Sequence, residues 1–276
     1  MTDSIVSAQW LSDHLDDPEV AIVDCRFSLA DEDLGRQQYL ASHIPGAFYL
    51  HLNRDLSSPV GERGGRHPLP NPAELAEKFA NIGIRSPQTL VVAYDDSRFA
   101  FASRLWWLLR YLGHDNVAVL DGGFSQWQQQ GYPVTAELPD PKPGEFAVRL
   151  RPDWVVDIAG VKARKDLPGV VLVDSREPGR YRGEYEPIDP IAGHIPGAVN
   201  YCWQEVTDDR GFVKSAAEQC QHWQALESAE EAIVYCGSGV TACVNLLSLH
   251  LAGVPNAKLY AGSWSDWCSY QTSTTN

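Results

Sequence analysis

The stretch at residues 232–242 reads Ala232-Ile233-Val234-Tyr235-Cys236-Gly237-Ser238-Gly239-Val240-Thr241-Ala242. The apolar run before Cys236 predicts a β-strand, and the two glycines after it predict a tight loop. Apolar residues then continue at helical spacing to Leu251, which predicts a helix directly after the loop. The stretch therefore places a cysteine at the junction between a strand and the start of a helix.

Such a junction favours thiol chemistry. Backbone N–H groups at a helix start lack intrahelical partners and carry partial positive charge, so they stabilise a thiolate. Gly237 and Gly239 have no Cβ and let the backbone curl closely around the sulfur. The stretch alone leaves two readings of Cys236 open: a nucleophile, or a buried cysteine that packs like a small hydrophobic side chain.

Length and composition limit the class of protein. A chain of 276 residues has room for two domains of ordinary size, and a hydrophobic content of 44% supplies their cores. The formal net charge of −14 argues against nucleic acid and anionic membrane surfaces as partners. The sequence shows neither a membrane-spanning stretch nor a secretory signal, so we expect a cytoplasmic protein.

The cysteines are expected to be free thiols. They form no dense disulfide framework and include no Cys-x-x-Cys pair. The eight histidines are scattered, so no metal site is expected. Cys243 is expected to serve packing, with a second redox thiol as the alternative. No special role is expected of the cysteines that lie in no motif: Cys25, Cys202, Cys220 and Cys268.

Four motifs occur twice in the same order. Their first copies begin at Val23, Ser42, Leu90 and Leu120, and their second copies begin at Val173, Gly193, Ala232 and Leu259. The second motif, for example, reads His-Ile-Pro-Gly-Ala at residues 43–47 and again at 194–198. Four repeats in one order indicate a duplicated domain.

A proline-rich linker at residues 137–145 separates the two copies, which we place at 1–140 and 146–276. Copy one is expected to form strands at 20–23, 90–94 and 117–120 and helices at 71–82 and 101–112. Apolar strands alternating with helices predict an α/β fold, with a mostly parallel sheet flanked by helices on both faces in each copy. Ligands bind at the carboxyl ends of such strands, where Cys236 lies.

The copies differ at the cysteine. Where copy two has Cys236 after its strand, copy one has Asp95. We therefore expect one catalytic copy and one inactive copy.

These motifs resemble the two-domain rhodanese family, the thiosulfate and 3-mercaptopyruvate sulfurtransferases. The motifs that carry the resemblance are Asp174-Ser175-Arg176, Gly179-Arg180-Tyr181, His194-Ile195-Pro196-Gly197-Ala198, Cys236 to Cys243, and Gly262-Ser263-Trp264. The resemblance implies two tandem rhodanese-like domains. It also implies a sulfane sulfur carried as a persulfide on Cys236, with ping-pong kinetics and no cofactor.

The expected partners are small molecules: an anionic sulfur donor, and a thiophilic acceptor such as cyanide, a thiol or a thioredoxin-like reductant. We expect a monomer. The neutral loop after Cys236 is similar to that of 3-mercaptopyruvate enzymes, which makes 3-mercaptopyruvate the favoured donor. Thiosulfate is the alternative.

The resemblance also suggests residue roles. Cys236, Ser238 and His67 are the catalytic candidates, and Ser238 resembles the serine of a Ser–His–Asp arrangement. Asp55 is a candidate for the acid, because His51 and Asn53 occupy the positions where it is expected. Alternatively, Ser238 and His67 serve only the loop backbone.

The substrate-binding candidates are Arg180, Gly237, Gly239, Val240 and Thr241. Arg180 suits a planar anion, although a surface salt bridge is the alternative. Members of the 3-mercaptopyruvate type usually have a second arginine shortly downstream. Residues 186–189 read Glu-Pro-Ile-Asp here, so Arg182 is the available substitute.

Some repeated residues are expected to be structural, because they occur in both copies: Asp24 and Arg26, Asp174 and Arg176, His43 and His194. Two other classes of protein are alternatives for the loop. A cysteine phosphatase needs an arginine where this chain has Ala242. A non-catalytic sulfur carrier would not need Arg180.

Overall fold

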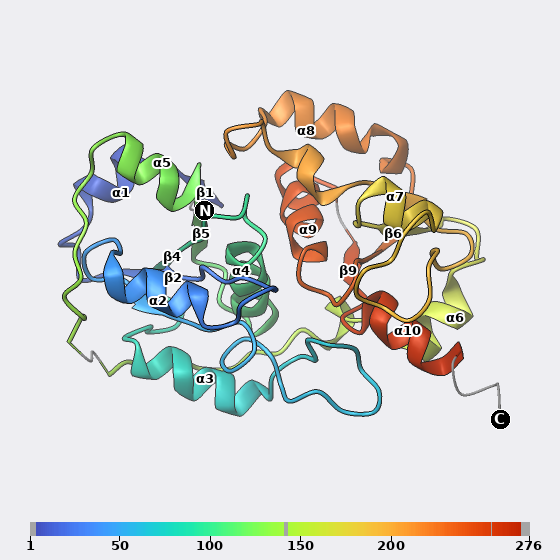
Figure 1. Cartoon of the computed structure of the whole chain (residues 1–276), viewed down its shortest axis with the longest axis horizontal. Helices are drawn as coiled ribbons and strands as arrows, with labels where there is room; N and C mark the ends of the chain where they lie inside the picture. Colours follow the sequence, from blue (N-terminus) through green and yellow to red (C-terminus); the bar gives the residue numbers. More distant parts are fainter. Residues whose placement is uncertain (1–3, 141–142, 255, 272–276) are drawn as a thin grey trace. The chain divides into compact units, whose positions relative to one another are not determined.

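The computed structural model describes residues 4–140, 143–254 and 256–271, and its contacts divide the chain into two compact units. Unit 1 comprises Met1–Ser57, Pro70–Arg151 and Thr207–Val213. Unit 2 comprises Ser58–Leu69, Pro152–Val206 and Lys214–Asn276. Each unit contains one parallel sheet with helices around it (Figure 1).

The sheet of unit 1 has the strand order β1-β5-β4-β2-β3, with every neighbouring pair parallel. Its elements are β1 (Ile5–Val6), α1 (Ala8–Asp13), β2 (Val20–Asp24), α2 (Leu34–Ala41), β3 (Phe48–Tyr49), α3 (Pro72–Asn81), β4 (Leu90–Tyr94), α4 (Ala102–Tyr111), β5 (Val117–Leu120) and α5 (Gly123–Gln129).

The sheet of unit 2 has the order β7-β6-β8-β9, again wholly parallel. Val155 adds a parallel bridge to Leu259 at the β9 edge, in the position that β1 takes in unit 1. The elements are η1 (Pro152–Trp154), α6 (Ile158–Arg164), β6 (Val170–Asp174), α7 (Pro178–Arg182), β7 (Val199–Asn200), η2 (Trp203–Val206), α8 (Ala216–Trp223), η3 (Gln224–Leu226), β8 (Glu231–Tyr235), α9 (Ala242–Leu251), β9 (Ala257–Leu259) and α10 (Ser263–Gln271).

The elements expected from sequence are confirmed, with ends that move by one or two residues. The first expected helix begins at Pro72 because Asn71 caps it: the Asn71 side chain accepts the Ala73 N–H at 2.9 Å. Proline suits the first helical position because its missing N–H has no partner there in any case.

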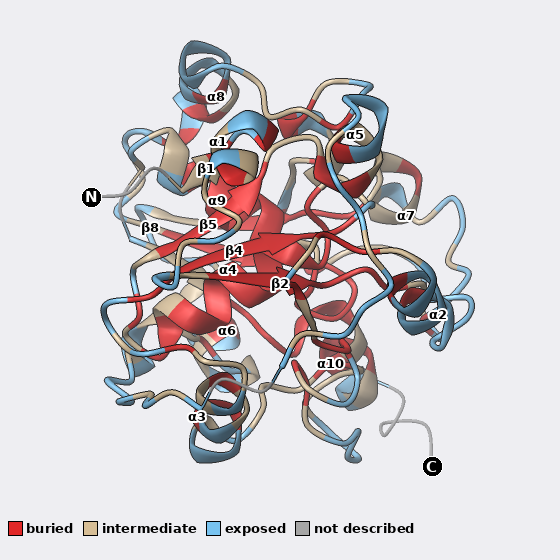
Figure 2. Cartoon of the chain, turned by 90° about the vertical axis from the view of Figure 1, so that its left-hand side faces the viewer, coloured by how far each residue is buried: buried red, intermediate tan, exposed pale blue. Residues whose placement is uncertain are grey.

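Burial explains why the central strands are apolar throughout. All five residues of β4 are buried, as are the last four of β8. Figure 2 shows β2 and β4 as buried ribbons at the centre of their sheet. Helices cover both faces of such a sheet, so its strands need no polar side. The expected α/β class is confirmed.

The repeated Asp–Arg motif forms the same buried ion pair in both units. Arg26 Nε and Nη2 bind Asp24 and Nη2 also donates to Ser42 O; the guanidinium of Arg176 likewise binds Asp174 and donates to Gly193 O. Both pairs tie the end of a central strand to the loop that carries the His-Ile-Pro-Gly-Ala motif. The expected structural role is confirmed.

The repeated histidines also play equal parts. The ring of His43 stacks on Tyr39 and its Nδ1 lies 2.7 Å from Tyr39 O. The ring of His194 stacks on Tyr181 and its Nδ1 lies 2.7 Å from Tyr181 O. Both histidines hold the turn in place, as the repetition indicated.

The contact units differ from a simple division near residue 140. Pro141 and Lys142 of the expected linker lie outside the described residues, but the following stretch packs on unit 1: Gly144 N donates to Ala80 O, and Arg151 N donates to Tyr111 O. Ser58–Leu69 from the first copy packs in unit 2, and Thr207–Val213 from the second copy packs in unit 1. The boundaries 1–140 and 146–276 stay a prediction about the duplication.

All six cysteines are free thiols, and only Cys220 is exposed. In the described ranges, none of the helices combines the length and the apolar character needed to cross a membrane.

Candidate active site

Cys236 lies directly after β8, at the carboxyl end of a central strand of unit 2. Cys236 is 2% exposed, and the Gly239 N–H points at its sulfur with an N–Sγ distance of 3.2 Å. The Cys236 N–H donates to Ser263 Oγ at 3.1 Å. The loop therefore holds the sulfur by its own backbone, with a donor directed at the place where negative charge would lie.

The loop is seated on the start of α10. The N–H groups of Trp264 and Ser265 donate to the carbonyls of Cys236 and Gly237 at 3.0 and 2.9 Å. Gly239 has φ +78°, and a Cβ there would lie 2.3 Å from Ala261 O, so only glycine fits. This geometry matches the role expected of Gly239, which is to shape the loop around the sulfur.

The remaining loop residues lead into α9. Val240 is buried and its carbonyl accepts the Cys243 N–H at 3.0 Å, while Thr241 occupies the N-cap position. Cys243 is fully buried, with its sulfur 3.5 Å from Gly239 O. The packing role expected of Cys243 is confirmed.

Ser238 and His67 form a hydrogen-bonded pair. His67 Nδ1 lies 2.7 Å from Ser238 Oγ, and both residues are buried. They are 171 positions apart in sequence but fall in the same contact unit. The structure thus brings the expected histidine to the expected serine, which lies two residues after the cysteine.

The segment Ser58–Leu69, which carries His67, is docked on α10. The Gly64 N–H donates to Asp266 Oδ1 at 2.8 Å, and the Arg66 N–H donates to Ser265 Oγ at 3.2 Å. A Cβ at Gly65 would lie 2.4 Å from Gly262 O, so the segment approaches the helix start as closely as a backbone can. The same helix start therefore seats both the cysteine loop and the histidine segment.

The acid expected to complete a Ser–His–Asp arrangement is engaged within unit 1. Asp55 accepts the His51 N–H at 2.8 Å and the Lys78 ammonium at 2.8 Å. His51 Nδ1 accepts the Asn53 N–H at 3.1 Å. A third member of the arrangement stays a prediction.

Arg180 comes from the short helix α7 and lies beside Gly237. Its Nη2 and Nη1 would stand 3.5 and 3.7 Å from a Cβ at that glycine. Its Nε and Nη2 bind Glu186, with Nη2–Oε1 at 2.7 Å and Nε–Oε2 at 3.1 Å. Glu186 thus fixes the guanidinium, whose Nη1 and Nη2 lie beside the residue next to the cysteine.

Arg66 was not predicted from sequence. Its Nη2 would stand 3.0 Å from a Cβ at Gly237, and its Nη1 binds Asp189 Oδ1. Arg182, the expected substitute for a second arginine, pairs instead with Glu184, and its side chain is 55% exposed. The available signal was the position of Arg66 next to His67, together with the acidic residues at 186 and 189.

Burial and pairing set the charges of these acids. Burial opposes ionisation of Glu186, but hydrogen bonds from Arg180 and from backbone N–H groups outweigh it and lower its pKa. Burial raises the pKa of Asp189, against the opposing effect of Arg66. Asp189 also lies 3.4 Å from Arg180 Nη2, so it joins the two arginines.

Ser263 is a second residue that sequence reasoning did not assign. It has φ +56°, a region that non-glycine residues rarely adopt, and its Oγ donates to Tyr260 O at 2.9 Å while accepting the Cys236 N–H. The corresponding residue of unit 1 is Gly123, with φ +64°. The serine at this position supports the cysteine loop at the cost of backbone strain.

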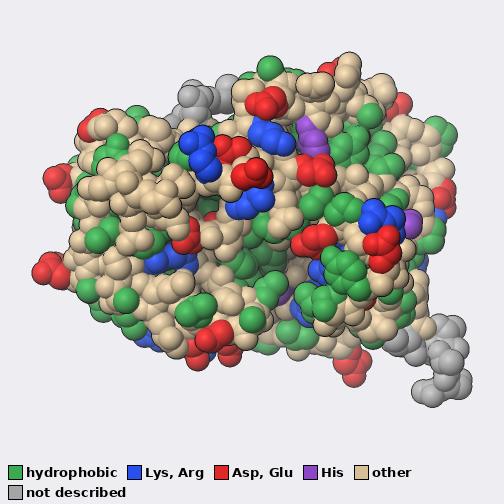
Figure 3. All heavy atoms as spheres, turned by 45° about the horizontal axis from the view of Figure 1, so that its top comes forward, with side chains coloured by type: hydrophobic (Ala, Val, Ile, Leu, Met, Phe, Trp, Pro, Cys, Tyr) green, Lys and Arg blue, Asp and Glu red, His purple; other side chains and the backbone are tan. Residues whose placement is uncertain are grey.

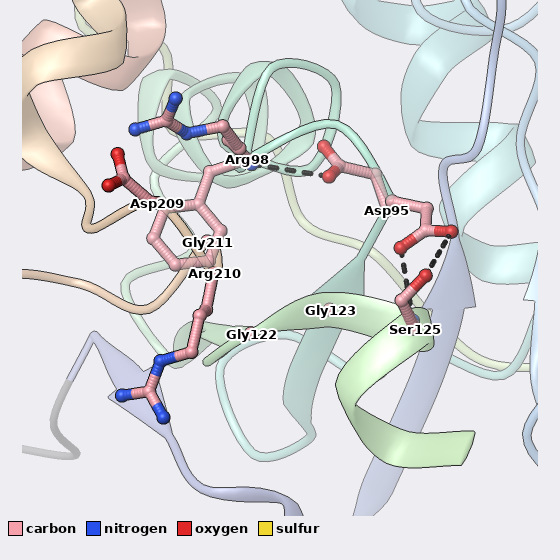
Figure 4. A pocket seen from close by; sticks show the side chains of 10 residues that line it. Asp95, Arg98, Gly122, Gly123, Ser125, Asp209, Arg210 and Gly211 are labelled. Carbon is pink, nitrogen blue, oxygen red and sulfur yellow. Dashed lines mark hydrogen bonds between the residues drawn. The ribbon is translucent and has the colours of Figure 1, made fainter. Parts of the chain in front are cut away.

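Unit 1 has a different loop at the corresponding strand end. The carboxylate of Asp95 accepts the N–H groups of Ser97, Phe99, Phe101 and Ala102 at 2.8–3.2 Å. Beside it lies a pocket of about 200 Å³, drawn in Figure 4, with Arg98 and Ser125 among its lining residues. In unit 1 the Asp95 carboxylate therefore accepts the hydrogen bonds of N–H groups in the loop and at the start of α4.

Among the described residues, no group of three or more His, Cys, Asp or Glu side chains is arranged to hold a metal ion.

Known proteins resemble this chain in both sequence and structure. The family model of the rhodanese-like domain matches residues 7–130 and 157–270. A Pseudomonas aeruginosa protein named as a probable 3-mercaptopyruvate sulfurtransferase is 45% identical over 95% of this chain and 94% of its own. A Mycobacterium tuberculosis protein whose name proposes thiosulfate sulfurtransferase activity is 38% identical over 92% of this chain and 89% of its own.

Among solved structures, the crystal structure of SseA from Escherichia coli has a TM-score of 0.83 and 34% sequence identity, covering 96% of this chain and all of that one. Similarity over nearly the full length, in both sequence and structure, extends to both units. The chain therefore belongs to the rhodanese family, as a sulfurtransferase built from two rhodanese-like domains.

Proposed function

We propose that this enzyme transfers sulfur from 3-mercaptopyruvate, through a persulfide on Cys236, to a thiophilic acceptor. The observation that carries the proposal is the His67–Ser238 pair, whose Nδ1–Oγ distance is 2.7 Å, with Ser238 in a loop, residues 237–241, that has no charged side chain. A carbon leaving group needs a proton when its bond to sulfur breaks, and this pair is a proton source beside the cysteine.

The first half-reaction transfers the sulfur to the enzyme. The Cys236 thiolate attacks the donor sulfur, an S–S bond forms, and the carbon–sulfur bond breaks. The electron pair of that bond leaves on carbon as the enolate of pyruvate, which takes a proton from Ser238. His67 replaces the proton on Ser238 and recovers one from the persulfide, whose outer sulfur becomes anionic.

In the second half-reaction the acceptor attacks the outer sulfur. The S–S bond breaks and its electron pair returns to Cys236 as the thiolate, while cyanide leaves as thiocyanate. The Gly239 N–H, 3.2 Å from the cysteine sulfur, is directed at charge that develops in both half-reactions. Backbone donors of this kind need no reorganisation during the reaction.

Thiosulfate is the second candidate donor. The Mycobacterium tuberculosis relative supports it by name, and Asp189 lies in the stretch where 3-mercaptopyruvate enzymes usually have a second arginine. A dianion would be favoured by basic residues beside the cysteine, and residues 237–241 contain none.

The test is the steady-state kcat/KM for both donors on one preparation, with cyanide as acceptor. We expect 3-mercaptopyruvate to exceed thiosulfate by at least about tenfold, or about 1.4 kcal/mol in transition-state free energy. A tenfold preference for thiosulfate would reverse the order of the candidates. Absence of turnover with either donor would instead support a non-catalytic sulfur carrier.

The proposal extends to partners and location. Acceptors are small thiophiles such as cyanide or thiols, or a thioredoxin-like reductant, and no cofactor is required. The charge of −14 disfavours nucleic acid, and on the face drawn in Figure 3 basic side chains lie beside acidic ones. Six free thiols support a reducing cytoplasm, and we propose a monomer.

A further inference from the structure

We infer that Arg66 and Arg180 together bind the donor carboxylate, and that Asp189 is a positioning residue that holds the two guanidinium groups side by side. The inference rests on the proposed function, because it concerns the same donor. It assigns the specificity of the site to an arginine that precedes the catalytic histidine.

Both arginines converge on Gly237. Arg66 Nη2, Arg180 Nη2 and Arg180 Nη1 lie 3.0, 3.5 and 3.7 Å from the position that a Cβ of this glycine would occupy. Gly237 directly follows Cys236, so the space left by its missing side chain lies beside the sulfur carrier. 3-Mercaptopyruvate carries its carboxylate two carbons away from its sulfur, so a donor held at Cys236 would present the carboxylate to nearby cations.

Asp189 keeps the two cations together. Two guanidinium groups so close would repel each other without an acid between them. Asp189, whose side chain is 2% exposed, binds Arg66 Nη1 through Oδ1 and lies 3.4 Å from Arg180 Nη2 through Oδ2. Arg66 thus keeps Nη2 toward Gly237. Arg180 shares Nη2 between Glu186 and Asp189, and its Nη1 lies 3.7 Å from the Cβ position of Gly237.

The cluster carries no excess of positive charge. Three arginines (Arg66, Arg176, Arg180) face four acids (Asp174, Glu177, Glu186, Asp189) in it. Fixed N–H donors in such a cluster suit a ligand with one negative carboxylate better than a dianion, which would need an excess of positive charge. This favours a 2-oxo acid over thiosulfate.

Backbone contacts fix the position of Arg66. Its N–H donates to Ser265 Oγ, and the preceding Gly65, with φ +80°, lies against Gly262 O. The same docking places His67 against Ser238. Arg66 therefore supplies the second arginine for the donor carboxylate, since residues 186–189 contain no arginine.

The main test replaces Arg66 with glutamine and measures kcat and KM for each donor. Removing a charged hydrogen-bond donor should raise KM for 3-mercaptopyruvate about 10- to 30-fold while kcat stays within about threefold. The kcat/KM for thiosulfate should change less than about threefold. A KM for 3-mercaptopyruvate within about twofold of wild type, or an equal loss with both donors, would overturn the inference.

The matched control is Arg182→Gln, which removes the same charge from an exposed pair with Glu184. Its kinetics should stay within about twofold of wild type with both donors. Unchanged urea unfolding and an unchanged rate of Cys236 alkylation by iodoacetamide will show that the Arg66 variant keeps its fold and its loop.

Pyruvate separates this inference from the donor assignment. It has the carboxylate but no sulfur, so its inhibition constant reports carboxylate binding even if thiosulfate proves to be the better donor. We expect the inhibition constant to rise about tenfold in Arg66→Gln. No change in pyruvate inhibition would overturn the carboxylate site by itself.

Asp189→Asn tests the positioning role. It should raise KM for 3-mercaptopyruvate, and the double variant with Arg66→Gln should lose less than the product of the two single effects, because both changes remove the same arrangement. Fully multiplicative effects would contradict coupling of Arg66 through Asp189.

Discussion

Corresponding central strands of unit 1 and unit 2 end in loops whose backbone N–H groups have different acceptors. In unit 1 the carboxylate of Asp95 accepts N–H groups of the loop and of the start of α4. In unit 2 a cysteine occupies that strand end, and the Gly239 N–H donates to its sulfur. A loop that binds the protein's own carboxylate has a structural role. A loop around a thiol can instead stabilise a negatively charged sulfur that is later transferred.

The backbone of the two loops shows the same difference. Unit 1 places Arg98 and Phe99 at φ +56° and +70°, while unit 2 places Gly239 at φ +78°. The glycine brings the unit 2 loop against Ala261 without a side chain in the way. The two units thus share the strand and the helix that follows it, but have different residues at the strand end: Asp95 in unit 1 and Cys236 in unit 2.

The largest effect is expected from Cys236→Ser. Turnover with either donor should fall at least about 1000-fold, because a serine hydroxyl ionises far less than a thiol and forms no persulfide. Thiocyanate formation measures it. Cys220→Ser, at the exposed cysteine, is the control and should keep wild-type activity. Surviving turnover in Cys236→Ser would remove the distinction between the two loops.

The ion pairs that both units share should stabilise both folds, but not equally. Asp24→Asn leaves the buried Arg26 guanidinium without its carboxylate and should lower the free energy of unfolding by about 3–5 kcal/mol. Arg176 also pairs with Glu186 at 3.2 Å, so Asp174→Asn should have the smaller effect. Urea unfolding of the two variants measures this. A larger loss in Asp174→Asn than in Asp24→Asn would contradict this order.

Asp95 should matter for stability rather than for chemistry. Asp95→Ala leaves buried N–H groups without an acceptor and should cost about 2–3 kcal/mol. Its kcat, measured well below the unfolding temperature, should stay within about twofold of wild type. A folded Asp95→Ala protein without activity would show that unit 1 contributes to the reaction.

The smallest of these effects concerns the serine that both loops contain. Ser238→Ala should lower kcat for 3-mercaptopyruvate about 10- to 50-fold by removing the proton source, and should affect thiosulfate less, because its sulfite leaving group needs no proton on carbon. Ser97→Ala, in the corresponding loop of unit 1, is the control. Equal losses with both donors would assign Ser238 to loop structure alone.

Much of the fold could be read from local patterns. β4 and β5 occur at the predicted residues, and β2 is only one residue longer, because an apolar strand in a parallel sheet is buried on both faces and leaves a continuous apolar signal. The helix ends were less certain, since the cap at Asn71 is decided by a single side chain.

The candidate site was only partly readable. Ser238 and His67 were proposed from the resemblance and lie within hydrogen-bond distance. Arg66, Asp189 and Ser263 were missed, because no periodicity marks a residue whose role depends on what packs against it. Arg182 was the wrong substitute: its neighbour Glu184 forms an exposed pair with it.

The sequence by itself determined the duplication, the α/β class and the contrast between Cys236 and Asp95, since each is read from short motifs that can be compared between the two halves of the chain. Only the tertiary structure decided that Ser58–Leu69 packs with unit 2 and brings Arg66 and His67 to the cysteine loop. The physical reason is that such contacts arise from close backbone approach and hydrogen bonds at the start of α10. These form between segments about 200 residues apart and leave no local pattern.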